Sequence, residues 1–253
     1  MTRAIQFFFL SMAIFNISLC FGNLNNVPPI EKDGVESLSF TRIYYNWTHA
    51  KILLQIAHYD QIEKMIERSI KLGIRYPINR YFKLGAFYHK VYGLRHDDDW
   101  NNQYGLWEWE RKNGHGNNIY SVELTARKRL YKTIVGEIRA SYHHNETTDL
   151  NSLKGRAGLT YTTFSHGTPQ FTWAISYELY HPLNFSEETI YERWGYVGFL
   201  FHAGSKISLG PFVARKRKVW TTSTAWKRDY PNDSYKLERL STILGLTVNC
   251  YIF

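Results

Sequence analysis

The sequence has very little cysteine and no long apolar run. Its two cysteines are Cys20 and Cys250, and Cys20 lies in an N-terminal segment that we expect to be removed, so the mature chain can form no internal disulfide. The mean hydropathy is −0.39, which excludes a bundle of apolar transmembrane helices. An exported chain of this kind must be stabilised by something other than disulfides.

Convincing helical periodicity is also missing. The one doubtful stretch, "DQIEKMIERS" at 60–69, is short and is better interpreted as a turn that leads into a strand. The formal net charge is +9, but lysine and arginine form no block apart from "RKRK" at 215–218. Without a basic tail, and with export expected, we predict no nucleic-acid partner.

The N-terminus has the layout of a secretory signal peptide. Arg3 forms a short basic head, and an apolar run follows from Ala4 to Phe15. This run is shorter than the ~20 residues that a membrane-spanning helix needs. We therefore predict a cleaved signal peptide at 1–22 and a polar N-terminal lead-in at 23–36.

Aromatic residues, in contrast, are abundant, at 17% with 19 Tyr and 8 Trp. Tyr and Trp favour β-strands and also the membrane–water interface. Apolar and polar residues alternate over much of the chain. In "RSIKLGIRY", Ile70, Leu72 and Ile74 lie on one face of a strand, and Lys71 and Arg75 lie on the other. This period of two residues predicts β-strands.

Twelve segments with this pattern follow one another: 37–46, 50–59, 65–76, 80–92, 102–111, 118–130, 134–144, 152–164, 170–181, 189–203, 206–216 and 235–253. From the sixth segment on, short and long connections alternate, which is typical of an outer-membrane barrel. Lipid offers the backbone no hydrogen bonds, so such a sheet must close. We predict an all-β protein, a twelve-stranded antiparallel transmembrane β-barrel over 37–253, with both termini on the short-turn side. The connection at 93–102 is longer than this pattern expects.

A soluble β-sandwich or soluble barrel would also alternate, with its apolar face turned inward. The polar faces here are rich in small residues and in charges of both signs, and the strands are longer than the usual five or six residues. Both features favour the membrane barrel.

The chain ends on the two-faced strand "LGLTVNCYIF". Here the sequence resembles bacterial outer-membrane barrels, whose insertion machinery recognises a C-terminal strand that ends in an aromatic residue. The resemblance implies Tyr251 and Phe253 as the assembly signal and a Gram-negative outer membrane as the location. It also implies the assembly machinery, the lipid bilayer and lipopolysaccharide as partners.

If the apolar faces contact lipid, the opposite faces line the lumen. Hairpin geometry then sets Arg127 opposite Glu137 and Lys154 opposite Glu178, and it leaves cations such as Arg139 and Arg156 in surplus. Glu67, and with less support Glu108 and Glu110, fall on the same faces. The predicted lumen-lining and solute-binding residues are Lys71, Arg75, Lys83, Glu123, Arg127, Arg129, Glu137, Arg139, Lys154, Arg156, Glu178 and Arg239.

Arginine and lysine rings in a pore favour anions, so we expect a porin-like channel for diffusion of small, preferably anionic solutes. Twelve strands, an Arg-lined wall and about 230 mature residues resemble the oligogalacturonate/sialic-acid porin family. That resemblance implies inner-wall arginines that guide acidic sugars. The chain is also similar to small outer-membrane barrels of the DUF2490 type.

Two alternatives stay open. The paired charges could simply fill a narrow lumen, giving a non-conducting outer-membrane barrel that serves surface interaction or envelope structure. An outer-membrane lipid hydrolase has less support: Ser141 and His143 fall on lumen positions, but "YHHNET" and "SHGTP" lack the His-x-Ser-Asn spacing of outer-membrane phospholipases. The acidic "HDDDW" at 96–100 is better interpreted as a solvated turn than as a cation site. We expect no enzyme activity, cofactor or metal.

Overall fold

The computed structural model of the protein describes residues 31–61, 65–93, 95–103, 106–112, 116–147, 149–184, 190–221 and 236–252. The predicted signal peptide (1–22), the larger part of the 217–234 connection and Phe253 lie outside the described residues. For residues 95–103 and 106–112 the backbone is described and the side chains are not.

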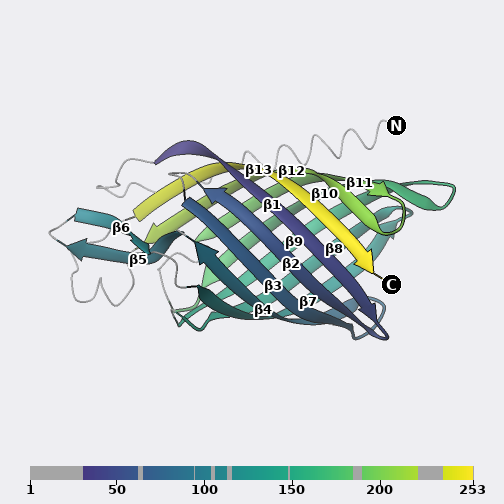
Figure 1. Cartoon of the computed structure of the whole chain (residues 1–253), viewed down its shortest axis with the longest axis horizontal. Coiled ribbons are helices and arrows are strands. Elements are labelled where there is room, and N and C mark those ends of the chain that lie inside the picture. Colours follow the sequence, from purple (N-terminus) through teal and green to yellow (C-terminus); the bar gives the residue numbers. More distant parts are fainter. Residues whose placement is uncertain are drawn as a thin grey trace.

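Every regular element of the described residues is a β-strand. The strands are β1 (Glu31–Trp47), β2 (Ala50–Gln61), β3 (Met65–Pro77), β4 (Phe82–Gly93), β5 (Arg95–Gln103), β6 (Leu106–Lys112), β7 (Asn117–Tyr131), β8 (Ile134–Asn145), β9 (Leu150–Ser165), β10 (Thr168–Pro182), β11 (Glu192–Ala203), β12 (Ile207–Thr221) and β13 (Lys236–Ile252). Eleven of them form a closed barrel in the order β1-β13-β12-β11-β10-β9-β8-β7-β4-β3-β2 (Figure 1). Within the described part of the chain, no helix is long and apolar enough to cross a bilayer.

The prediction of twelve wall strands is wrong by one, because the predicted strand at 102–111 is not part of the wall. Strands β5 and β6 pair only with each other, as a separate two-stranded sheet, which projects beyond the barrel at the left of Figure 1. The chain between β4 and β7 is therefore one long connection. This correction explains why the connection at 93–102 is longer than the predicted pattern expects, since short and long connections alternate from β4 to β13 once β5 and β6 are left out of the wall.

The prediction of an entirely antiparallel sheet is also wrong. With eleven wall strands, the first and last point in the same direction, and β1 pairs with β13 in parallel from Gly34↔Ser241 to Tyr45↔Ile252. We call this pair the seam. The start of β1 consequently lies at the end of the barrel with the longer connections, the long-loop side, whereas the end of β13 lies on the short-turn side, at the turn after Trp47. The prediction that both termini lie on the short-turn side is therefore wrong, because the wall begins on the long-loop side.

The other predicted wall segments each overlap one observed strand. The largest difference at the N-terminal end is in β1, which begins at Glu31 rather than at residue 37. This longer strand brings Glu36, which the sequence analysis assigned to the polar lead-in, into the wall of the barrel.

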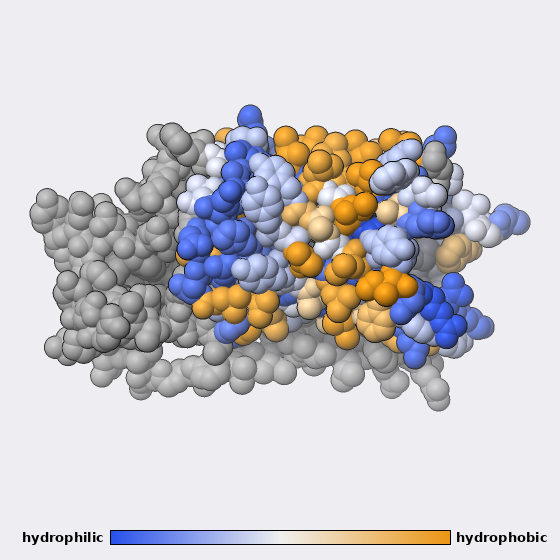
Figure 2. All heavy atoms as spheres, turned by 90° about the horizontal axis from the view of Figure 1, so that it is seen from below, coloured by the Kyte–Doolittle hydropathy of each residue, from blue (hydrophilic) through white to orange (hydrophobic). Residues whose placement is uncertain are grey.

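The apolar faces of the strands point outward. Leu72, Leu124, Val213 and Leu246 are all exposed, whereas Glu123 is buried. Figure 2 shows apolar side chains across the middle of one outer face, with polar residues toward both ends. The distribution is the inverse of that of a soluble domain, in which large exposed apolar areas are rare.

One side of the interior is packed with apolar and aromatic side chains. We call this the aromatic cluster; its buried members are Leu38, Tyr59, Trp194, Phe212, Ala214 and Ile243, from β1, β2, β11, β12 and β13. The Trp194 ring lies 5.5 Å from that of Tyr196, and the Phe212 ring lies 5.7 Å from that of Phe40. The opposite side of the interior is charged.

Candidate functional site

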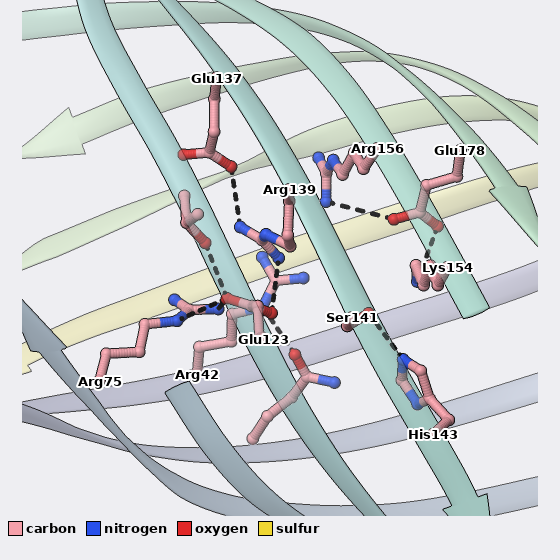
Figure 3. A network of polar contacts seen from close by, with 12 residues as sticks. Arg42, Arg75, Glu123, Glu137, Arg139, Ser141, His143, Lys154, Arg156 and Glu178 are labelled. Carbon is pink, nitrogen blue, oxygen red and sulfur yellow. Dashed lines mark hydrogen bonds and ion pairs between the residues drawn. The ribbon is translucent and has the colours of Figure 1, made fainter. Parts of the chain in front are cut away.

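Charged side chains from β3, β7, β8, β9 and β10 form one network on the inner face, which we call the charged wall (Figure 3). Its centre is the buried carboxylate of Glu123 on β7. Arg75 Nη2 on β3 lies 3.2 Å from Glu123 Oε1, and Arg139 Nη1 on β8 lies 3.5 Å from Oε2. Thr125 Oγ1 donates a third contact of 3.1 Å to the same carboxylate.

A second buried carboxylate, Glu178 on β10, holds two cations from β9. Lys154 Nζ lies 2.9 Å from Glu178 Oε1, and Arg156 Nη1 lies 3.6 Å from Oε2. Tyr196 Oη donates a hydrogen bond of 3.1 Å to Glu178 Oε1. This carboxylate therefore joins the charged wall to the edge of the aromatic cluster.

The prediction that Arg139 and Arg156 are surplus cations is wrong. Arg139 also donates from Nη2 to Glu137 Oε1 at 2.8 Å, so it binds two carboxylates, and Arg156 binds Glu178. Arg127 is opposite Glu137, as predicted, and Thr125 is opposite Arg139. Glu137, however, bonds to Arg139 on its own strand.

Lys154 is opposite Tyr180 rather than Glu178, because the turn is centred between His166 and Gly167 and the register shifts by one further residue between Pro169 and Phe171. Proline has no N–H to donate to the ladder, which is why it occurs at bulges and strand edges. Lys154 still reaches Glu178 diagonally.

The charged wall is accessible to solvent, although it faces inward. The side-chain exposure is 21% for Arg75, 19% for Arg139, 28% for Glu137 and 32% for Arg156. Inward-facing groups on the aromatic side, such as Ser208, Ser241 and Ile243, are fully buried. The cations of the charged wall are therefore partly exposed to solvent, whereas these groups on the aromatic side are not.

Four predicted lumen residues carry charge without an ion pair to any described residue. Lys71 lies over the Phe87 ring, 4.4 Å from its centroid, on the inner wall. Lys83, Arg127 and Arg129 lie toward the short-turn side. Arg239 lies apart from all of these, buried on β13 opposite Lys218. Glu108 and Glu110 fall on β6, outside the wall.

The sequence analysis missed a buried ionic group at the seam. Glu36 Oε1 accepts a hydrogen bond of 3.1 Å from Ser241 Oγ, and its Oε2 accepts one from Tyr59 Oη. Lys216 Nζ lies 3.4 Å from Glu36 Oε2 and donates to Tyr59 Oη at 2.7 Å. These residues come from β1, β2, β12 and β13, so the group joins the strands on both sides of the seam. Nothing in the sequence around Glu36, which resembles a polar lead-in, indicated that its carboxylate would be buried at the seam.

Arg42 on β1 was missed as well; its Nε donates to Gln55 Oε1 at 2.8 Å on the inner wall. Tyr251, predicted as part of an assembly signal, stacks on Tyr44 across the seam with ring centroids 5.2 Å apart.

Ser141 and His143 do lie together. Ser141 Oγ and His143 Nε2 are 2.9 Å apart on the inner face of β8. Within the described residues, Ser141 is the only hydrogen-bond partner of this imidazole, so no carboxylate orients it as in a catalytic triad. No group of three or more metal-ligating side chains occurs among the described residues.

Comparison with known proteins returned no matching family model and no matching curated protein.

Proposed function

We propose that the protein is a transmembrane β-barrel of an outer membrane that passes small, preferably anionic solutes along its charged wall. The observation that carries the proposal is the inversion of polarity: a closed sheet with an exposed apolar outer face and a solvent-accessible, ion-paired inner face. Membrane barrels have this arrangement.

Two aromatic girdles support the membrane assignment. On the long-loop side, exposed Tyr88, Tyr120, Tyr142 and Tyr177 border the aliphatic band, and on the short-turn side exposed aromatics such as Tyr45, Trp47, Tyr76, Tyr131 and Phe164 border it. Tyr88 Oη donates to Asn118 Oδ1 at 3.0 Å, so the hydroxyl finds polar partners on the side away from the band. Membrane barrels carry aromatic girdles of this kind at both interfaces.

Outward-facing Arg193, Arg215 and Arg217 lie beyond Val197 and Val213 on the long-loop side. Cations at this depth support contact with lipopolysaccharide phosphates, because arginine pairs well with phosphate oxygens.

The preference for anions rests on the sign of the charged wall. The inward carboxylates on its strands are Glu67, Glu123, Glu137 and Glu178. The inward cations on these strands and on the adjacent β4 outnumber them: Lys71, Arg75, Lys83, Arg127, Arg129, Arg139, Lys154 and Arg156. Basic linings favour anions. The eleven strands differ from the even number of bacterial single-chain barrels, so strand number no longer supports the resemblance to the porin family.

Planar-bilayer recording of the full folded chain tests this function. We expect resolved current steps and, in a KCl gradient, a reversal potential shifted toward that of chloride. Lys71→Glu, on the inner wall, is expected to reduce the anion preference, whereas Lys128→Glu, on the outer face, is expected to leave it unchanged. Equal effects of the two variants would contradict a passage along the charged wall.

The aromatic cluster favours a second candidate, a non-conducting barrel that serves surface interaction or envelope structure, because it fills one side of the interior. Folded protein that inserts into bilayers and gives no current steps would support this candidate over the channel.

A further inference from the structure

The short-turn end of the barrel concentrates positive charge. Four cations on β2, β4 and β7, which we call the rim cations, have inward positions there: Lys51, Lys83, Arg127 and Arg129. Others lie on the turns and outer face of the same end: Arg80, Lys128, Lys132 and Lys206. Among the described residues, the carboxylate at this end is that of Glu137, which already accepts a hydrogen bond from Arg139.

The inward direction of the rim cations follows from strand alternation. Lys51 shares its face with buried Leu53, and Arg127 shares its face with buried Thr125. Lys83 lies between two outward side chains, Phe82 and Leu84, that are both exposed. The rim cations therefore border the inside of the mouth.

These cations repel one another. Lys51 is opposite Arg75, and Lys83 is opposite Thr125, which is the inward neighbour of Arg127 on β7. Arg75 is compensated by Glu123. Within the described residues, Lys51, Lys83 and Arg127 form no ion pair. Such a group of like charges is stabilised when an anion binds between them.

We infer that the rim cations bind a soluble polyanion that carries two or more phosphate groups. From β2 to β7 the wall spans three strand spacings, about 14 Å, which is too wide for one phosphate to bridge. Each phosphate group carries a charge of about −1.5 to −2 at neutral pH, so two of them match four cations, whereas carboxylates would be needed in twice that number. Arginine forks and lysine ammonium groups both suit phosphate oxygens.

This inference rests on the proposed function only in needing a mouth that is open to solvent. It goes further in naming one end of the barrel at which a solute binds and the chemistry of that solute. The charged wall, with its cations in surplus, then continues from the mouth toward the middle of the barrel.

Calorimetric titration of the folded full-length chain, in zwitterionic micelles, with inorganic triphosphate as the probe tests the inference. We expect saturable binding, with citrate and monophosphate bound at least about tenfold more weakly. Lys83→Gln/Arg127→Gln is expected to weaken triphosphate binding about tenfold, as the loss of two charge contacts of about 0.7 kcal/mol each predicts. Lys51→Gln/Arg129→Gln provides a second variant pair with the same expected direction.

The matched control is Lys128→Gln/Lys132→Gln, which removes two cations from the outer face and turn of the same hairpin. Retained affinity in this control supports the inference. An equal loss in the control, equal affinity for citrate, or no saturable binding to folded protein would overturn it. Because binding in micelles requires no current, a barrel that conducts anions without binding triphosphate contradicts this inference and leaves the proposed function intact.

Discussion

The ionic group at the seam gives a prediction with a large expected effect. The Glu36 side chain is 0% exposed and Lys216 is 7% exposed. Removing one partner of a buried ion pair leaves the other charge buried without compensation, which costs about 3–5 kcal/mol. Glu36→Ala also removes the acceptor for Ser241 Oγ and Tyr59 Oη. We therefore expect the free energy of unfolding to fall by at least about 3 kcal/mol.

Glu238→Ala is the matched control, because Glu238, like Glu36, forms an ion pair next to the seam, in this case with Arg217. Its carboxylate accepts hydrogen bonds of 2.5 and 2.8 Å from Arg217, but the two side chains are 23% and 28% exposed. Partly exposed ion pairs contribute about 0–1 kcal/mol. The measurement is reversible urea unfolding of the micelle-bound barrel, followed by tryptophan fluorescence.

Glu36→Ala/Lys216→Met should recover much of the loss, since it removes the second charge together with the first. A loss for Glu36→Ala within about 1 kcal/mol of that for Glu238→Ala would refute the argument that the seam depends on this group. An unchanged stability of the double variant relative to Glu36→Ala would show that hydrogen bonds rather than charge dominate.

Three further predictions test the orientation, the packing and the strand count. Leu124→Arg should lower the unfolding free energy in lipid vesicles by about 2–4 kcal/mol, because it places a charge in the middle of the outer band, whereas Leu130→Arg at the short-turn rim should cost about 0–1 kcal/mol; equal costs would contradict the membrane position. Gly245→Ala should destabilise the barrel by about 1–3 kcal/mol in the urea assay, because the added Cβ would lie 2.0 Å from Cζ of the Phe212 ring. Gly155→Ala should change the stability little, because no atom lies within 4 Å of the added Cβ. Replacing residues 95–112 by a short flexible loop should leave heat-modifiable migration on gels intact, since β5 and β6 pair only with each other; loss of the folded band would contradict the eleven-strand wall.

The direction of the strand faces could be predicted from the sequence, because one side of most wall strands is largely apolar in its middle part. A one-residue slip would move every side chain of a strand to the other face of the sheet, so the alternation determines which side chains point inward and which point outward. This is why the position of Arg75, Glu123 and Glu178 on one inner wall followed from residue spacing alone.

The strand count could not be predicted in the same way. The segment "LWEWER" at 106–111 alternates as the wall strands do, and alternation does not say which strand is the neighbour. The residue directly opposite Lys154 was mispredicted for a related reason. The two-residue turn His166–Gly167 and the bulge at Pro169 together move the residue opposite Lys154 from Glu178 to Tyr180, and nothing in the local pattern sets the length of that shift.

The parallel seam explains the residues that the sequence analysis either missed or assigned another role. Parallel pairing is slightly less stable per residue than antiparallel pairing, and the middle of the outer face of β1 offers only the hydroxyls of Ser37, Ser39 and Thr41. Closure must then be specified from inside. The buried Glu36 group binds the seam toward the long-loop side, and the stacked rings of Tyr44 and Tyr251 do so toward the short-turn side. The inward ring of Tyr251 thus contributes to the contact that holds β1 and β13 in register.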